Sequence, residues 1–209
     1  MKRTAQQWWE ALARCGVKEP QLSTWAPVFA DSINDATFSR GEDELVDWLG
    51  QILHESNKLT ALTENMNYSA QRLTEVWPGR FKTLADAQPY AHNPEALANR
   101  VYGGRMGNKA PGDGWKYRAR TPIGLTGFDN YAHVGLLMGQ DLINQPELLE
   151  QPHYALEACL MWWEDTIPDS MIGDPEKITQ KINGGLIGLA ERIHSTQLAE
   201  GALDCPQST

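Results

Sequence analysis

The stretch Gln51-Ile-Leu-His-Glu-Ser-Asn-Lys-Leu-Thr60 joins an apolar helix pattern to a polar connection, and it runs directly into Ala61-Leu-Thr-Glu-Asn-Met-Asn-Tyr-Ser69. Upstream of it, apolar residues recur at steps of three and four: Leu45, Trp48, Leu49, Ile52 and Leu53. This spacing predicts a core helix that ends near His54-Glu55, where Ser56-Asn57 break the pattern. The helix would hold Glu55 rigidly, and Glu64 follows nine positions later in a polar segment.

Glu55 and Glu64 are therefore carried by different local structures. Two carboxylates in different environments can have different pKa values, which acid and base catalysis at neutral pH requires. We expect Glu55 to be protonated through partial burial beside the apolar helix end, and Glu64 to be ionised in a wetter loop. The alternative is that both are ordinary surface carboxylates, because Glu is mostly exposed in folded proteins.

Four sequence blocks carry a resemblance to a known family. They are His54-Glu55-Ser56, then Glu64-Asn65-Met66-Asn67-Tyr68-Ser69, then Tyr117-Arg-Ala-Arg-Thr-Pro-Ile-Gly-Leu-Thr-Gly-Phe-Asp-Asn-Tyr131, and finally Ile182-Asn-Gly-Gly185. In sequence and in order they resemble the family-19 glycoside hydrolases, the chitinase-like enzymes, and especially the phage endolysins among them. The resemblance implies a lysozyme-like, two-lobed helical fold.

The resemblance also implies roles for individual residues. Glu55 matches the general acid, Glu64 the general base, and Thr126 the hydroxyl that helps to hold the attacking water. Five further residues match substrate-binding positions: Tyr68, Arg118, Arg120, Asn130 and Asn183. Structural alternatives stay open for some of them, since Thr126 can cap a helix, Asn183 can end one, and the two arginines can be structural or solvated.

One departure from the family pattern lies between the second and third catalytic candidates. Plant-type members carry Gly-Arg-Gly and then Gln before the Leu-Ser/Thr element, whereas this chain has Ala119-Arg-Thr121 and Gly124. Without that Gln, we do not expect one sugar contact of the plant enzymes in this protein. The substrate that the resemblance favours is the glycan strand of peptidoglycan, built from alternating N-acetyl amino sugars.

Length and composition indicate a globular protein. The chain has 209 residues, of which 41% are hydrophobic and 22% charged, enough for a sizeable core. We expect one catalytic domain over residues 1–209, with two lobes around a glycan cleft. The net charge of −9 argues against nucleic acid and against stable binding to an anionic membrane surface.

The termini and cysteines bear on where the protein is made. The N-terminal sequence lacks the apolar segment and cleavage site of a secretory signal. Three unpatterned cysteines, at positions 15, 159 and 205, indicate reduced thiols. The resemblance implies a protein that is made in the host cytoplasm and acts on the cell wall in the periplasm, and we expect it to be a monomer. The resemblance implies that a holin gives it access to the wall.

Several helix ends can be predicted from local signals. Thr4 with Gln7 and Ser39 with Glu42 form candidate capping boxes. Thr126 is a candidate cap for the helix that follows it. Caps are also predicted at Ser69, Asn93 and Asp174.

Less regular features are predicted elsewhere in the chain. Pro27 is expected only in the first turn of its helix. The Gly-rich segment 103–127 should form loops or a hairpin, and residues 202–209 a loose tail. The fold class is mainly α with a small hairpin or loop region.

Other chemistries find little support in the sequence. Lys58 stands where a zinc protease motif would place its second His, so no metal site and no cofactor is expected. A Cys-His peptidase built on Cys15 is disfavoured, because this residue lies on an apolar helix face. Three other glycan functions remain as alternatives: a chitinase, a lytic transglycosylase and a non-catalytic glycan-binding protein.

Overall fold

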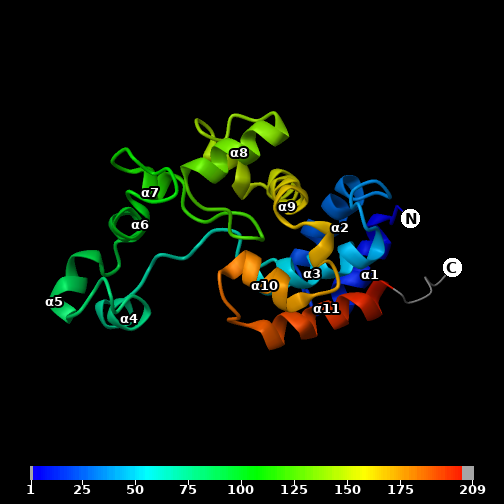
Figure 1. Ribbon diagram of the computed structural model, residues 1–209, viewed down its shortest axis with the longest axis horizontal. Helices are drawn as coiled ribbons and strands as arrows, with labels where there is room; N and C mark the ends of the chain where they lie inside the picture. Colours follow the sequence, from blue (N-terminus) through cyan, green and yellow to red (C-terminus); the bar gives the residue numbers. More distant parts are fainter. Residues whose placement is uncertain (1, 204–209) are drawn as a thin grey trace. The chain divides into compact units, whose positions relative to one another are not determined.

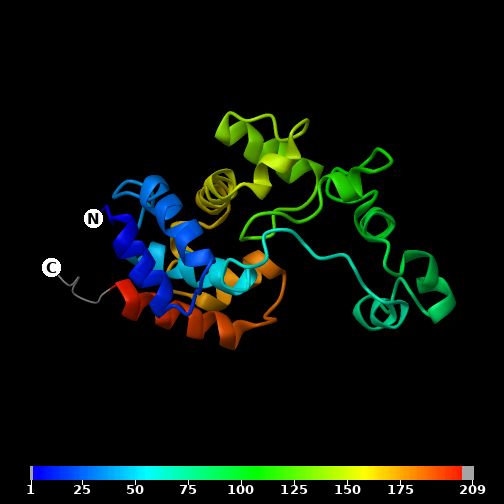
Figure 2. The ribbon, with the colours of Figure 1, turned by 180° about the vertical axis from the view of Figure 1, so that it is seen from behind.

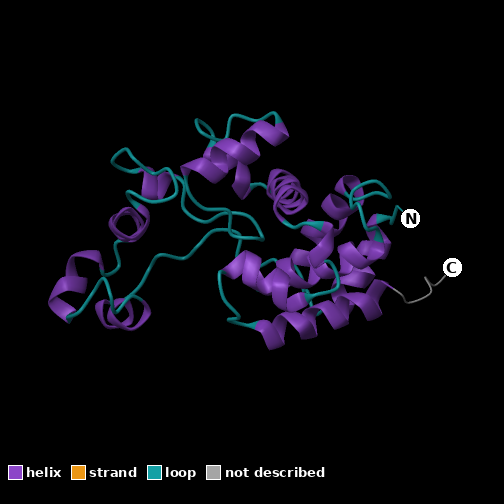
Figure 3. Cartoon of the chain, in the orientation of Figure 1, coloured by secondary structure: helices purple, strands orange, loops and turns teal. Residues whose placement is uncertain are grey.

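The computed structural model describes residues 2–203, and in this range the chain is built from helices joined by loops, with no strand (Figure 3). The α-helices are α1 (Ala5–Arg14), α2 (Gln21–Ser32), α3 (Glu42–Glu55), α4 (Ala70–Val76), α5 (Leu84–Ala87), α6 (Pro94–Tyr102), α7 (Asp113–Lys116), α8 (Phe128–Met138), α9 (Pro152–Thr166), α10 (Pro175–Asn183) and α11 (Leu189–Leu203). Three short 3₁₀ helices complete the set: η1 (Gln88–Tyr90), η2 (Pro146–Glu150) and η3 (Asp169–Met171). The prediction of a mainly α fold is confirmed.

The expected hairpin region is largely loop. Within the described residues, its β character is limited to two isolated antiparallel bridges, Thr63 with Arg120 and Arg120 with Leu125. The rest of segment 103–127 consists of turns and the short helix α7.

The chain divides into two compact units. Unit 1 comprises Met1–Leu62, Thr121–Gly124 and Glu147–Thr209, and unit 2 comprises Thr63–Arg120 and Leu125–Pro146. Each unit has its own cluster of buried apolar side chains. The arrangement of two lobes around a glycan cleft stays a prediction.

Helix α3 is the central element of unit 1. Its predicted stripe is buried throughout, with exposed fractions of 3% or less from Leu45 to Leu53. Trp48 packs between the rings of Phe29 and Phe38, at centroid distances of 5.7 and 5.5 Å. Helix α11 runs along α3 in the views from both sides (Figures 1 and 2). The last residue of α3, Glu55, is therefore carried on a firmly packed helix.

Unit 2 has a smaller core. It contains Met66, Leu73, Phe81, Ala87, Leu97, Ala98 and Val101. Tyr68, Trp77, Tyr102 and Trp115 pack against this core from its edge. Because Met66 and Tyr68 belong to the same short segment as Glu64, burial of their side chains fixes the chain close to that carboxylate.

Most predicted caps are confirmed. Thr4 and Gln7 form a reciprocal capping box at the start of α1. Ser69, Asn93 and Asp174 each accept a hydrogen bond from a backbone N–H in the first turn of α4, α6 and α10, respectively.

Two predicted caps are wrong. Helix α3 begins after Gly41, whose φ of 63° suits a glycine. The Ser39 hydroxyl instead donates to Asp169 at 2.8 Å, and Glu44 Oε2 lies 3.2 Å from it. Helix α8 begins after Gly127 rather than Thr126. In both cases a glycine near the predicted cap supplies the turn, so no side-chain cap forms.

Two further predictions need correction. Pro27 lies inside α2, not in its first turn, and burial of Trp25, Ala26 and Phe29 on the same helix compensates for the missing backbone hydrogen bond. The start of the predicted loose tail is helical, because Ala202 and Leu203 are buried in the last turn of α11. Residues 204–209, including Cys205, lie outside the described part of the chain.

None of the helices in residues 2–203 is both long enough and apolar enough to span a bilayer.

Candidate active site

Glu55 is held in place by a buried arginine. It is the last residue of α3, and its side chain is 26% exposed. Arg192 of α11, only 2% exposed, donates from Nη2 to Glu55 Oε1 at 2.6 Å and from Nη1 to Gln51 Oε1 at 2.7 Å. A charge-assisted bond from a buried guanidinium fixes the position of the carboxyl group.

An unusual turn follows Glu55. Asn57, Lys58 and Leu59 have φ values of 47°, 58° and 66°, a left-handed region that non-glycine residues seldom occupy. The fully buried hydroxyl of Ser56 donates to Ile52 O at 2.6 Å and accepts from Leu59 N at 2.8 Å. The Ser56 hydroxyl thus stabilises the strained turn that directs the chain away from the helix end.

His54 lies beside the same group of side chains. Burial lowers the pKa of its imidazole, and the charge of Arg192 acts in the same direction, while Glu55 and Glu191 act against it. The ring lies against the backbone of Gly188, where an added Cβ would come within 2.6 Å of His54 Nε2. A glycine is needed at position 188 for this close approach.

Glu64 is positioned by unit 2. Its backbone N–H donates to Ala119 O at 3.0 Å, next to the bridge between Thr63 and Arg120. Its side chain accepts a hydrogen bond of 2.6 Å at Oε2 from the hydroxyl of Tyr102, the last residue of α6. Backbone and side chain are therefore both fixed.

The surroundings of the two carboxylates differ in part from the expectation. Burial raises the pKa of Glu64 above its ordinary value, and the hydrogen bond from Tyr102 offsets part of the rise. Burial and the proximity of Glu64 raise the pKa of Tyr102, so this hydroxyl stays a donor. Glu64 is thus more buried than predicted. Glu55 is partly buried at the end of α3, as predicted, and is in addition paired with a cation.

Thr126 and Asn130 lie at the start of α8. Thr126 precedes the N-cap Gly127, and its carbonyl accepts from Asn130 Nδ2 at 2.8 Å. Asn130 is exposed in the first turn of the helix. The structure thus brings together two residues that the resemblance assigns to water and sugar, and both belong to unit 2 with Glu64.

The two candidate arginines differ in accessibility. Arg118 is half-buried and stacks over Trp115, with its Cζ 3.9 Å from the ring centroid. Arg120 is 4% exposed, and its Nη1 donates to Lys116 O and to the Tyr131 hydroxyl. This favours the structural alternative for Arg120.

The remaining two candidates lie in different units. Tyr68 is half-buried in unit 2, with its ring 5.3 Å from that of Trp77. Asn183 is the exposed last residue of α10 in unit 1, and Gly184, with a φ of 70°, ends that helix. The amide of Asn183 faces Ile187 O at 3.5 Å.

The sequence analysis did not identify two functional candidates, Arg192 and Tyr102. Arg192 contacts Glu55 across 137 positions, and Tyr102 contacts Glu64 across 38. The one available signal was the place of Arg192 between Leu189 and Ile193 on a helix with apolar spacing. A charge in such a place requires a buried partner.

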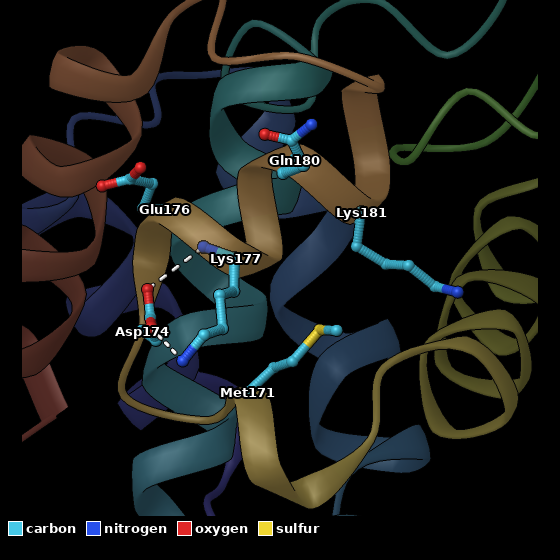
Figure 4. A pocket seen from close by; sticks show the side chains of 6 residues that line it. All are labelled: Met171, Asp174, Glu176, Lys177, Gln180 and Lys181. Atoms are coloured by element: carbon cyan, nitrogen blue, oxygen red, sulfur yellow. Dashed lines mark hydrogen bonds and ion pairs between the residues drawn. The ribbon is translucent and has the colours of Figure 1, made fainter.

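A hollow of about 590 Å³ lies between η3 and α10 in unit 1 (Figure 4). Its lining includes Met171, Gln180 and Lys181, together with Lys177, which is paired with Asp174 at 2.7 Å. None of the predicted site residues lines it, so we assign it no role in catalysis. In residues 2–203, no three His, Cys, Asp or Glu side chains are grouped so as to hold a metal ion.

Comparisons with known proteins bear on the family and the fold. No family model matches the chain. A glycosyl hydrolase family 19 domain-containing protein of Haemophilus influenzae strain Rd is 37% identical over 147 residues, which cover 69% of this chain and 72% of that protein.

Solved structures show the same fold. Chitinase C from Streptomyces griseus HUT6037 superimposes with a TM-score of 0.61 and 16% identity, covering 99% of this chain and 94% of that one. The class IV family-19 chitinase from Zea mays superimposes with a TM-score of 0.52 and 12% identity, covering 95% of this chain and 82% of that one. Because the Haemophilus relative is 37% identical over 72% of its length, the chain belongs to glycosyl hydrolase family 19.

Proposed function

We propose that this protein cleaves the N-acetyl amino sugar glycan strand of bacterial peptidoglycan by an inverting mechanism with two carboxylates. The observation that carries the mechanism is that each candidate carboxylate has a dedicated polar partner: Arg192 for Glu55 and Tyr102 for Glu64. An ordinary surface Glu needs no such support. The preference for peptidoglycan rests on the likeness of the four sequence blocks to endolysin members of the family.

Glu64 is the proposed general base. A base acts best when its pKa approaches the working pH, and burial moves the pKa of Glu64 in that direction. The hydroxyl of Tyr102 occupies Oε2, which leaves Oε1 to take a proton from water. Thr126 is proposed to orient that water, which attacks the sugar on the face opposite to the leaving group.

Glu55 is the proposed general acid. When it gives its proton to the leaving glycosidic oxygen, it becomes a carboxylate, and Arg192 stabilises that product of the transfer. Proton donation by Glu55 is therefore compatible with the arginine beside it.

The substrate-binding candidates support the glycan in this proposal. Exposed Asn130 and Asn183 each offer a donor and an acceptor, which suits hydroxyl and N-acetyl groups. Tyr68 and the Arg118–Trp115 pair offer flat, half-buried surfaces for a sugar ring. We further propose a monomer without cofactor, made in the host cytoplasm, which reaches the periplasmic wall with the help of a holin.

Chitin is the second candidate substrate, because the similar solved structures are named chitinases. Purified peptidoglycan and N-acetylglucosamine oligomers should be digested side by side, with Glu55→Gln as the inactive control. We expect soluble muropeptides from peptidoglycan and at least a ~100-fold loss in the control. Cleavage of the chitin oligomers alone would make the protein a chitinase, and binding without cleavage of either would make it a glycan-binding protein.

The roles of the two carboxylates can be tested separately. An aryl glycoside with a good leaving group needs no general acid, whereas it still needs a base to activate water. Glu55→Gln should therefore retain activity on a dinitrophenyl glycoside of the preferred sugar, and Glu64→Gln should not. The opposite pattern would exchange the two roles.

A further inference from the structure

Gln51 is a buried polar residue in the apolar stripe of α3. It is 1% exposed and lies one helical turn before Glu55, on the same face. Its Oε1 accepts from Arg192 Nη1 at 2.7 Å, while Arg192 Nη2 holds Glu55 at 2.6 Å. One guanidinium thus bonds one neutral and one charged acceptor on consecutive turns of one helix.

The orientation of the Gln51 amide follows from its partner. A guanidinium has donors only, so the amide must present its oxygen to Arg192. The amide nitrogen Nε2 is left buried, without a hydrogen-bond partner among the described residues. A buried donor without a partner costs free energy, so the bond to Arg192 is kept in spite of this cost.

The packing of α3 on α11 brings these residues together. A Cβ built on Gly50 would lie 2.7 Å from Thr196 Cα and 2.8 Å from Thr196 N, which is too close for any side chain. Thr196 lies one turn after Arg192 on α11. The two backbones therefore approach closely near the place where Arg192 meets Gln51, which restricts the register of the two helices.

We propose that Gln51 is a positioning residue for Glu55. It holds the Arg192 guanidinium against Glu55 with an uncharged acceptor, so that the charge of the arginine is directed to Glu55 alone. This inference rests on the proposed function of Glu55 as the general acid. The other charged or titratable groups at this place are His54 on α3 and Glu191 on α11.

Two substitutions distinguish the positioning of Glu55 from a purely structural link between α3 and α11. Gln51→Met keeps the length of the side chain but removes the acceptor. Gln51→Glu keeps the acceptor but adds a second carboxylate that competes for the guanidinium. Thr196→Val is the matched control, because it changes the same helix interface at a buried hydroxyl that has no hydrogen-bond partner among the described residues.

The first measurement needs no substrate. When both Nη groups are bonded, rotation about the Cζ–Nη bonds is slow and the side-chain N–H signals of Arg192 are resolved by NMR. We expect these signals in the wild type, in Thr196→Val and in Gln51→Glu, and their loss in Gln51→Met. Unchanged Arg192 signals in Gln51→Met would overturn the proposal. Because this measurement needs no cleavage, its result is separate from the test of the proposed function.

The second measurement is the pH profile of kcat and KM. For Gln51→Met we expect kcat to fall at least ~10-fold with KM within about twofold of the wild type. For Gln51→Glu the pH profile of kcat should differ from that of the wild type, because the second carboxylate competes with Glu55 for the Arg192 guanidinium. A wild-type pH profile for Gln51→Glu would show that Gln51 only links the two helices, and it would overturn the proposal. This outcome does not depend on whether Gln51→Met folds.

Discussion

Among single residues, Tyr102 has the simplest relation to its partner: it donates one hydrogen bond of 2.6 Å to Glu64. This bond lowers the pKa of Glu64, whereas burial raises it. Removing the hydroxyl leaves burial unopposed, so Tyr102→Phe should raise the pKa of Glu64 further. A general base works only when ionised, and activity should therefore be lost at a higher pH on the acidic side.

The test is the pH dependence of kcat/KM for wild type and Tyr102→Phe. Tyr90→Phe is a suitable control, since Tyr90 packs on Phe81 in the same unit and not on Glu64. An acidic limb at the same pH in all three proteins would show that Tyr102 does not act on the base.

Ser56 is a second residue whose removal has a defined cost. In Ser56→Ala the buried N–H of Leu59 would lose its partner in the strained turn after Glu55. An unsatisfied buried donor costs about 1–3 kcal/mol, so urea unfolding should show a loss of that size. Thr60→Ala, which alters an exposed hydroxyl of the same turn, should stay within about 0.5 kcal/mol. Equal effects of the two substitutions would contradict this account of the turn.

At the level of helices, the contact between α3 and α11 determines whether Arg192 can reach Glu55. Gly50→Ala would place a Cβ inside Thr196, so we expect a loss of about 1–3 kcal/mol and a weaker activity. Gly201→Ala, on the open side of α11, should instead stabilise by about 0.5–1 kcal/mol. Urea unfolding of both variants measures these changes in stability. An unchanged stability of Gly50→Ala would contradict the close packing of α3 on α11.

Helices were predicted well from the sequence where apolar periodicity was strong. The stripe from Leu45 to Leu53 was identified correctly, as was the helix end at Glu55. The caps at Ser39 and Thr126 were wrong, because Gly41 and Gly127 provide the turn by backbone conformation, which side-chain signals do not reveal. Burial of Trp25 and its neighbours likewise outweighed the local effect of Pro27.

The candidate site was predicted only in part for the same kind of reason. Motif likeness could point to Glu55 and Glu64, since each lies in a short recognisable block. Their partners Arg192 and Tyr102 are set by tertiary contacts over long sequence separations, which spacing does not encode. The sequence therefore predicted the partial burial of Glu55 at the end of α3, but neither the burial of Glu64 nor the two partners.

For the molecule as a whole, the thiols of Cys15 and Cys159 are expected to serve as probes of unfolding and not to take part in catalysis. Cys15 is 2% and Cys159 0% exposed, and burial raises the pKa of Cys15 to about 11. In a Cys205→Ser background both thiols should react with a disulfide reagent only as unit 1 unfolds. Replacing both with Ala should lower stability but leave glycan cleavage intact. Rapid labelling of the native protein, or loss of activity in a folded variant, would contradict this.

The two-carboxylate mechanism makes a firm statement about the product of a β-linked strand. Water activated by Glu64 must attack opposite to the leaving group, so the new reducing end begins as the α anomer and carries the elements of water. NMR of the anomeric protons in the first minutes of a peptidoglycan digest, with the mass of the fragments, measures both properties. The account predicts an initial α anomer on hydrolysed fragments. An initial β anomer would remove inversion, and 1,6-anhydro ends that lack the water would show a transglycosylase with no need for Glu64 as a base.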